Sequence, residues 1–167
     1  MGKNMVRMKT VAAVMALSIL AAGCSGGGSE SSEPAADTVK AEAPVDTGPP
    51  AADDVATLDG VAYASLTGDA EAGKSSFNQC RTCHVIDPGM NRLGPSLADI
   101  VGREAGGVAG FNYSPATADS GIIWTEEKLN QFLEKPARVI PKTKMFYAGM
   151  PDPQARANLI AYLKNPS

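Results

Sequence analysis

The chain has 167 residues, a formal net charge of −3, one histidine, three cysteines and 5% aromatic residues. This length fits one domain with appendages. A net charge so close to zero excludes a nucleic-acid-binding protein that works by neutralising phosphates. The histidine and cysteine counts exclude a His-rich metal site and a zinc site of four thiolates. No apolar run reaches the roughly 18 residues that a membrane-spanning helix needs.

Residues 1–23 are predicted to be a lipoprotein signal peptide. They contain three cations and no acid, and residues 11–22 are apolar except for one serine. A cationic start, a short apolar run and a small-residue ending are typical of an export signal. The ending Leu20-Ala21-Ala22-Gly23-Cys24 resembles the lipobox of bacterial lipoproteins, whose cysteine is acylated, although Ala21 stands where that motif usually has leucine. The alternative is ordinary signal-peptide cleavage. Acylation of Cys24 is favoured because an odd cysteine otherwise leaves an exported protein with a reactive thiol.

Residues 24–66 are predicted to be a disordered Ala/Pro/acidic tether that starts at the acylated cysteine. After Cys24 this segment holds eight acids against Lys40 alone, a net charge of −7, among Ser, Gly, Ala and Pro. Such a composition buries too little apolar surface to offset the entropy of ordering. As a flexible coil its ends would lie roughly 35 Å apart. A passive spacer is the alternative to a functional tether, and residues 61–66 are the part that we expect to be able to pack on the domain.

Residues 67–167 are predicted to be the working domain, and they contain the c-type heme attachment pattern Cys80-Arg81-Thr82-Cys83-His84. Two thiols separated by two residues bond to the two vinyl groups of one heme, and the next residue places its imidazole under the iron. A thioredoxin-like CxxC would need a βαβ setting that the sequence lacks, and a zinc site would lack a fourth soft ligand nearby. Cys80 and Cys83 are therefore the predicted thioether residues, and His84 is the predicted iron ligand.

A methionine is expected to occupy the other axial position of the iron. The candidates after the leader are Met90, Met145 and Met150. Met90 follows His84 by only six residues and would not reach the opposite face of a heme. Met145 follows His84 by 61 residues, in a loop opened by Pro141 that also contains Met150. Position alone favours Met145 and leaves Met150 open.

Cap residues predict three helices in this domain. Asp69, Thr125 and Asp152 are good N-caps. Acidic residues follow Thr125 in the first turn, and Pro136 is expected to end that helix. Pro153 suits the first position of the third helix. The apolar face of the third helix consists of Leu159, Ile160 and Leu163.

A close crossing of the first and last helices is also expected. Gly73 lies four residues before Phe77, so both share one helix face. A glycine there would let the last helix approach closely, with Tyr162 against it. Ordinary core packing is the alternative for each of these side chains taken singly.

From about residue 68 to residue 164 the sequence resembles class I c-type cytochromes, specifically the mitochondrial cytochrome c and bacterial cytochrome c2 group. The resemblance implies an all-α cytochrome c fold, with three to five helices around one covalently attached heme c. Besides the heme motif, it rests on Gly68–Lys74 with Phe77, Gly94–Leu97, Gly102-Arg103, Gly110–Tyr113, Gly121–Trp124, Pro141–Met145 and Leu159–Lys164.

The resemblance also implies roles for single residues. The carbonyl of Pro95 accepts a hydrogen bond from the proximal histidine, and Met145 becomes the second iron ligand. Arg103, Tyr113 and Trp124 hold the heme propionates, whose burial needs donors. Surface ion pairing or core packing is the alternative for these three.

Two departures from the mitochondrial pattern fall beside the expected methionine. Phe132 stands where that pattern usually has a tyrosine, and Thr117 stands where it usually has an asparagine. In the mitochondrial pattern, both positions belong to the polar network next to the ligand.

Ligation by histidine and methionine leaves no open position on the iron, so the site is suited to single-electron transfer. The sequence thus predicts a monomeric electron carrier, not an enzyme, that is lipid-anchored on the periplasmic side of a bacterial membrane. The expected partners are a quinol–cytochrome c oxidoreductase and a terminal oxidase or reaction centre. The alternatives are a heme c subunit of a larger membrane dehydrogenase or oxidase, and a heme peroxidase or sensor with a displaceable methionine.

Four cations close together in sequence predict a basic docking surface for acidic redox partners. They fall within ten residues around the expected ligand loop, where positive charge would steer the encounter. A solvated face is the alternative. The four residues are Lys135, Arg138, Lys142 and Lys144.

Overall fold

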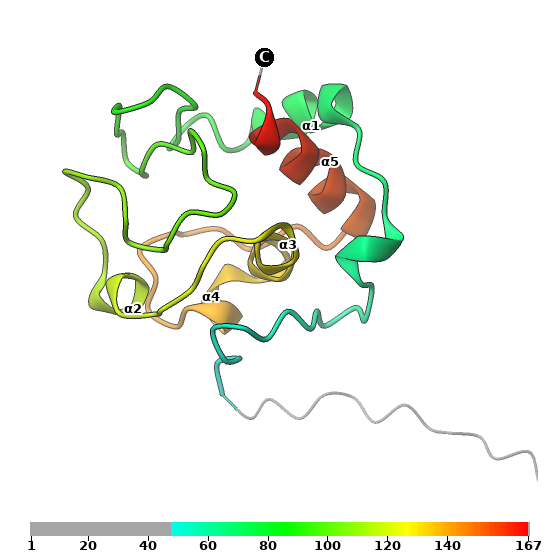
Figure 1. Ribbon diagram of the computed structural model, residues 1–167, viewed down its shortest axis with the longest axis horizontal. Helices are drawn as coiled ribbons and strands as arrows, with labels where there is room; N and C mark the ends of the chain where they lie inside the picture. The colour runs from blue at the N-terminus through cyan, green and yellow to red at the C-terminus, as the bar shows by residue number, and fades with distance from the viewer. Residues whose placement is uncertain (1–47, 167) are drawn as a thin grey trace, which may run out of the picture. The chain divides into compact units, whose positions relative to one another are not determined.

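The computed structural model describes residues 48–166, so the predicted signal peptide, Cys24 and the tether up to residue 47 lie outside the described residues (Figure 1). The described part is helical and contains no β-strand, only an isolated antiparallel bridge between Glu104 and Ile123. The expected all-α fold is confirmed. Its elements are η1 Tyr63–Ser65, α1 Ala70–Phe77, α2 Pro115–Ala118, α3 Glu126–Glu134, α4 Pro136–Val139 and α5 Pro153–Lys164.

The three predicted helices begin at their predicted caps. The side chains of Asp69, Thr125 and Asp152 each accept a hydrogen bond from a backbone N–H two or three residues later. Each such cap stabilises its helix by about 1 kcal/mol. Helix α3 ends at Glu134, and Pro136 opens the short helix α4. None of the helices within residues 48–166 is long and apolar enough to cross a membrane.

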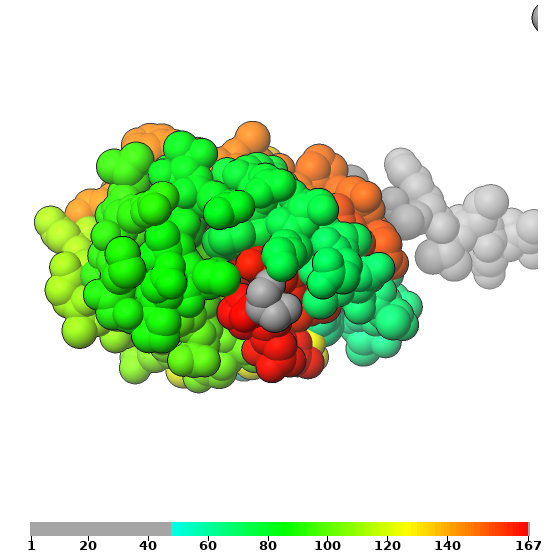
Figure 2. Space-filling model, turned by 90° about the horizontal axis from the view of Figure 1, so that it is seen from above, coloured from blue at the N-terminus to red at the C-terminus, as the bar shows by residue number. Residues whose placement is uncertain are grey.

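Helices α1 and α5 cross in close contact, as the sequence predicts. A Cβ atom on Gly73 would overlap the carbonyl of Asn158 and lie 2.9 Å from the Cβ of Tyr162. The rings of Phe77 and Tyr162 pack 5.4 Å apart, centroid to centroid, on the same side. In the space-filling view the red end of α5 lies against the green residues of α1 and the segment that follows it (Figure 2). This crossing fixes the point from which the chain leaves α1.

One hydrophobic core joins these two helices to α3. It contains buried side chains from α1, α3, α4 and α5 and from the loops between them. Within it, the rings of Trp124 and Phe132 lie 4.8 Å apart. Trp124 precedes α3 and Phe132 lies on it, so the segment from the bridge at Ile123 into α3 is held on the core.

The N-terminal limit of the ordered domain differs from the prediction, which places all of residues 24–66 in a disordered tether. Residues 51–59, which we call the strap, are instead bound to α3. The Lys128 ammonium donates to the carbonyls of Ala51 and Asp54, at 3.0 and 2.7 Å. The Glu134 carboxylate accepts from the N–H groups of Leu58 and Asp59, at 2.7 and 3.0 Å. Hydrogen bonds with helix side chains order a segment whose composition offers little apolar surface.

The α1–α5 crossing yields the first testable prediction. Gly73→Ala should destabilise the protein by about 1–3 kcal/mol, because the added methyl group overpacks the contact with the α5 backbone. This loss should outweigh the roughly 1 kcal/mol by which alanine is the better helix former. Urea unfolding followed by far-ultraviolet circular dichroism measures the difference. Ser75→Ala, on the exposed side of the same helix, is the control, and equal midpoints for the two variants would contradict the prediction.

Candidate functional site

The cysteines and the histidine of the motif lie on one turn directly after α1. The N–H of Cys80 donates to the carbonyl of Phe77 at 2.8 Å, so the chain keeps turning where the helix ends. The N–H groups of Cys83 and His84 then donate to the carbonyl of Cys80, at 3.0 and 2.8 Å. Both thiols are free and half-buried. The turn therefore presents two thiols and an imidazole from five consecutive residues.

The Cys80 thiol is held in its neutral form. Burial raises the pKa of Cys80 to about 11, with a smaller contribution from the neighbouring Cys83. A redox-active CxxC has a lowered thiol pKa instead. No group of three or more metal-ligating side chains is assembled within residues 48–166, and no βαβ unit surrounds the motif there. These observations argue against the thioredoxin-like and zinc-site alternatives.

Gly94 and Pro95 fix the position of the His84 ring. Its Nδ1 lies 2.8 Å from the carbonyl oxygen of Pro95. Because a carbonyl only accepts, the proton sits on Nδ1 and the lone pair on Nε2, the arrangement typical of a metal-ligating histidine. Burial lowers the pKa of His84, with the Pro95 hydrogen bond opposing, so the ring is neutral. A Cβ atom at Gly94 would overlap the ring, so only glycine leaves it room.

The three predicted propionate donors come together around the Glu104–Ile123 bridge. The backbone N–H of Trp124 donates to the carbonyl of Arg103 at 2.9 Å. The Arg103 guanidinium donates to the carbonyls of Ala98 and Ser96, at 2.6 and 2.8 Å. Burial lowers its pKa, and the interaction with Tyr113 opposes that shift. Burial raises the pKa of Tyr113, which is half-buried. A charged donor, a phenol and an indole thus occupy one region.

The three candidate methionines differ in their surroundings. Met90 is 54% exposed, and Met150 is 5% exposed within the hydrophobic core. The backbone N–H of Met150 donates to the carbonyl of Leu133 at 2.8 Å, which fixes it to α3. Met145 is half-buried and packs against the edge of the core. Of the three, only Met145 is supported by the core without being enclosed in it.

Two side chains that the sequence reasoning did not assign to this task hold the loop around Met145. The Tyr147 hydroxyl donates to the Gln79 side-chain oxygen at 2.9 Å, next to the cysteine turn. The Lys144 ammonium donates to the carbonyls of Asn112 and Tyr113, at 2.8 and 3.1 Å. In the sequence, the only signal for this role is that Lys144 and Tyr147 flank Met145 and Phe146.

The four residues of the predicted docking surface fall into two groups. Lys144 holds the chain at residues 112 and 113, and Arg138 is half-buried and donates to the carbonyl of Ala56 at 3.2 Å. Lys135 and Lys142 are exposed, and their side chains make no hydrogen bond or ion pair within residues 48–166. Phe146, four residues after Lys142 in the loop, is fully exposed.

The residues of the site fit a covalently attached heme. Two free thiols are spaced for two thioether bonds, a neutral imidazole offers Nε2, and Gly94 leaves space beside that ring. A methionine at the edge of the core, Met145, could supply the soft second ligand that c-type centres use.

Comparison with known proteins gives the same result. The family model for cytochrome c matches residues 70–167. Cytochrome c2 of Rhodopila globiformis is 48% identical over 98 residues, which are 58% of this chain and 92% of that protein. The cytochrome c-type cyt cy of Rhodobacter capsulatus is 46% identical over 101 residues, 60% of this chain and 50% of that protein.

A solved structure agrees. That of cytochrome cH from Methylobacterium extorquens has a TM-score of 0.56 and 41% identity, covering 58% of this chain and 98% of its own. On the family match and these likenesses, the chain belongs to the cytochrome c family, and it is an electron carrier, not an enzyme, with one covalently attached heme c.

Proposed function

We propose that this chain is a membrane-tethered carrier that passes single electrons from a quinol–cytochrome c oxidoreductase to a terminal oxidase or photosynthetic reaction centre. Heme c supplies an iron that alternates between the ferric and ferrous states. The observation that carries the proposal is the 2.8 Å contact between Nδ1 of His84 and the carbonyl of Pro95. It keeps Nε2 available as a permanent iron ligand and increases its basicity. A permanently ligated iron exchanges electrons without binding substrate.

In this proposal Met145 would be the second protein ligand of the heme iron. Three observations support it over Met150: Met150 is enclosed in the core, its backbone is fixed to α3, and the loop around Met145 is tied down on both sides by Lys144 and Tyr147. A loop fixed at two points limits the freedom of the thioether between them. Retention of methionine then depends on the protein and not on the weak iron–sulfur bond alone.

Arg103, Tyr113 and Trp124 are the proposed donors to the heme propionates. The guanidinium has five N–H groups, of which two are used by carbonyls of the chain. Trp124 is buried next to Arg103, to whose carbonyl its backbone N–H donates. The Arg103 guanidinium stays protonated at neutral pH even though its pKa is lowered. Its charge therefore offsets the cost of burying a carboxylate.

Replacing each methionine separately tests the ligand assignment. Met145→Ala should abolish the weak red absorption band of a methionine–iron(III) bond and allow cyanide or carbon monoxide to bind readily. Met150→Ala should keep that band and lose about 2–5 kcal/mol of stability, because it leaves a cavity in the core. Optical spectra of the ferric and ferrous proteins, with and without added ligand, make the measurement. The reverse pattern would assign the ligand to Met150, and a band surviving in both variants would exclude either residue.

The basic docking surface is proposed in a narrower form, made of the exposed Lys135 and Lys142, with Phe146 as an exposed apolar residue of the ligand loop. Neutralising both lysines (Lys135→Gln with Lys142→Gln) should slow electron transfer to the acceptor roughly tenfold at low salt. The difference should vanish at high salt, because screening removes the steering. Lys164→Gln, an exposed lysine at the end of α5, is the control. Stopped-flow rates without any dependence on ionic strength would remove the proposal.

The lipid anchor on Cys24 is proposed from the sequence alone. Cys24→Ser should release the protein from membranes into the periplasmic extract and remove the mass of the acyl groups, with an unchanged heme spectrum. Membrane fractionation and intact-mass spectrometry make the measurement. A Cys24→Ser protein that stays in the membrane fraction with a stoichiometric partner would support the alternative of a subunit in a larger complex.

A further inference from the structure

We propose that the strap and Arg156 form one clamp on the C-terminal end of the Met145 loop, so that a segment outside the family-matched residues positions the iron ligand. The strap precedes residue 70, where the family match begins. The inference rests on the proposed role of Met145 as ligand. It assigns Asp59, Glu134 and Arg156 as positioning residues, which act on the loop and not on the heme.

Arg156 on α5 is the centre of the clamp. Its side chain is 0% exposed. Nη1 donates to the carbonyls of Met150 and Pro151, at 2.8 and 2.9 Å, where the ligand loop ends. Nη2 donates to the Asp59 carboxylate at 2.6 Å, and Nε donates to the Asn130 side-chain oxygen at 2.8 Å. One guanidinium thus joins the loop, the strap and α3.

The charge of this guanidinium explains why the strap matters. A buried cation is stable only when it is paired and hydrogen-bonded. Asp59 is the carboxylate that pairs with it closely, since the other, Glu134, lies 4.0 Å away. Partial burial raises the pKa of Asp59, but the hydrogen bonds from Arg156, Val61 and Thr57 and the Arg156 charge lower it by more, so it is ionised.

Glu134 connects the strap to the loop from the other side. Its carboxylate accepts the N–H groups of Leu58 and Asp59. Its backbone carbonyl lies against Gly149, so closely that a Cβ atom there would overlap it. Gly149 has a φ of +113°, which favours glycine. The last residue of α3 therefore contacts the strap with its side chain and the ligand loop with its backbone.

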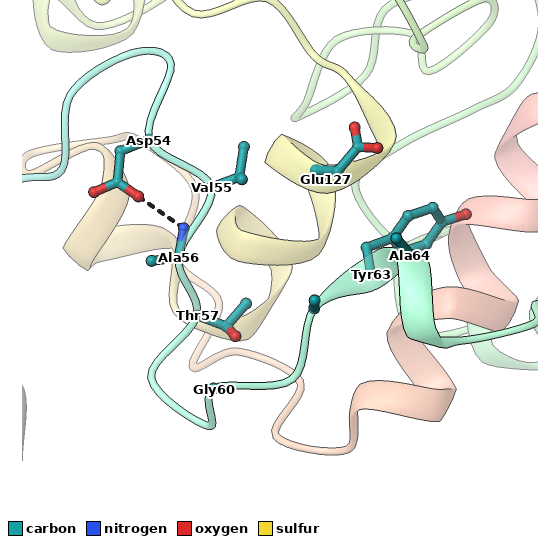
Figure 3. A pocket seen from close by; sticks show the side chains of 9 residues that line it. Asp54, Val55, Ala56, Thr57, Gly60, Tyr63, Ala64 and Glu127 are labelled. Atoms are coloured by element: carbon teal, nitrogen blue, oxygen red, sulfur yellow. Dashed lines mark hydrogen bonds between the residues drawn. The ribbon is translucent and has the colours of Figure 1, made fainter. Parts of the chain in front are cut away.

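The strap is held along its length and not only at Asp59. Besides the Lys128 bonds to Ala51 and Asp54, the Gln131 side-chain amide donates to the carbonyl of Ala56 at 2.9 Å. Within the strap, Asp54 accepts from the N–H of Ala56 at 2.7 Å, as Figure 3 shows. Between the strap and the start of α3, a hollow of about 540 Å³ remains at Val55, Tyr63 and Glu127. Contact through polar groups, with space left beside them, indicates that directed hydrogen bonds hold the strap in place.

The consequence for the ligand follows from the loop's other attachments. Met145 lies between the Lys144 contact and the clamped residues 149–151, and the N–H of Met150 donates to Leu133. When the Asp59 charge is lost, the buried guanidinium has no close counter-charge, and its bonds to the loop carbonyls weaken. The loop end then moves more freely, and an external ligand competes better with the methionine sulfur.

Competition by imidazole in the full-length, heme-loaded ferric protein tests the clamp. Asp59→Asn should bind imidazole about tenfold more tightly than the wild type, measured by loss of the methionine–iron(III) band. Asp53→Asn removes the same charge from an exposed strap residue whose carboxylate acts on Lys128, whereas the carboxylates paired with Arg156 are those of Asp59 and Glu134, and it should stay within twofold of the wild type. Asp59→Glu should restore most of the resistance to imidazole, and it keeps the test usable if Asp59→Asn does not fold.

A second measurement separates positioning from general stability. Asp69→Ala removes the side-chain cap of α1 at the end of the helix away from the cysteine turn, so it should lower the unfolding midpoint without a matching gain in imidazole affinity. Equal imidazole affinity in Asp59→Asn and wild type would overturn the clamp, as would a gain in Asp69→Ala as large as in Asp59→Asn. Failure of the ligand assignment looks different: the wild type would lack the methionine band, or Met145→Ala would keep it.

Discussion

The close crossing of α1 and α5 at Gly73 is the constraint on which the site depends. Helix α1 runs directly into the cysteine turn, so the position of the thiols and of His84 follows from where α1 lies on α5. Helix α5 also carries Arg156, which bonds the end of the loop that contains Met145. One helix pair therefore sets both the histidine side and the methionine side of the proposed iron site. Backbone contact at Gly73 makes this reference rigid, because at that point no side chain separates the two helices.

Away from this helix pair, the side chains of the site and the end of the ligand loop are held mainly by hydrogen bonds to backbone carbonyls. Pro95 orients His84, Ala98 and Ser96 orient Arg103, and Met150 and Pro151 are held by Arg156. Carbonyl acceptors are fixed by the course of the chain and do not depend on the neighbouring side chain. Long loops around a small core can in this way hold donors and ligands in place without the support of a β-sheet. Within residues 48–166 no side-chain nitrogen or oxygen is left buried without a partner.

Features with a local or spacing signal were predictable from the sequence. The caps at Asp69, Thr125 and Asp152 depend on neighbours two or three residues away, and the heme motif is a run of five residues. The strap had no such signal, because its partners Lys128, Glu134 and Arg156 lie 74 to 97 residues further along the chain. From composition alone, a polar segment is predicted to be disordered. Composition does not reveal that polar side chains of a distant helix form hydrogen bonds with the backbone of that segment.

The strap also changes the physics of the proposed tether. With Ala51 bound to Lys128, a tether from Cys24 ends near residue 50 and not at residue 66. Sixteen fewer residues of extended chain shorten its maximum reach by on the order of 50 Å. The proposed tether also has less negative charge, since Asp59 neutralises Arg156 and belongs to the folded domain. A membrane-held carrier of this design would search a smaller volume for its partners, at a correspondingly higher effective concentration, because that concentration rises as a flexible linker shortens toward the span it must bridge.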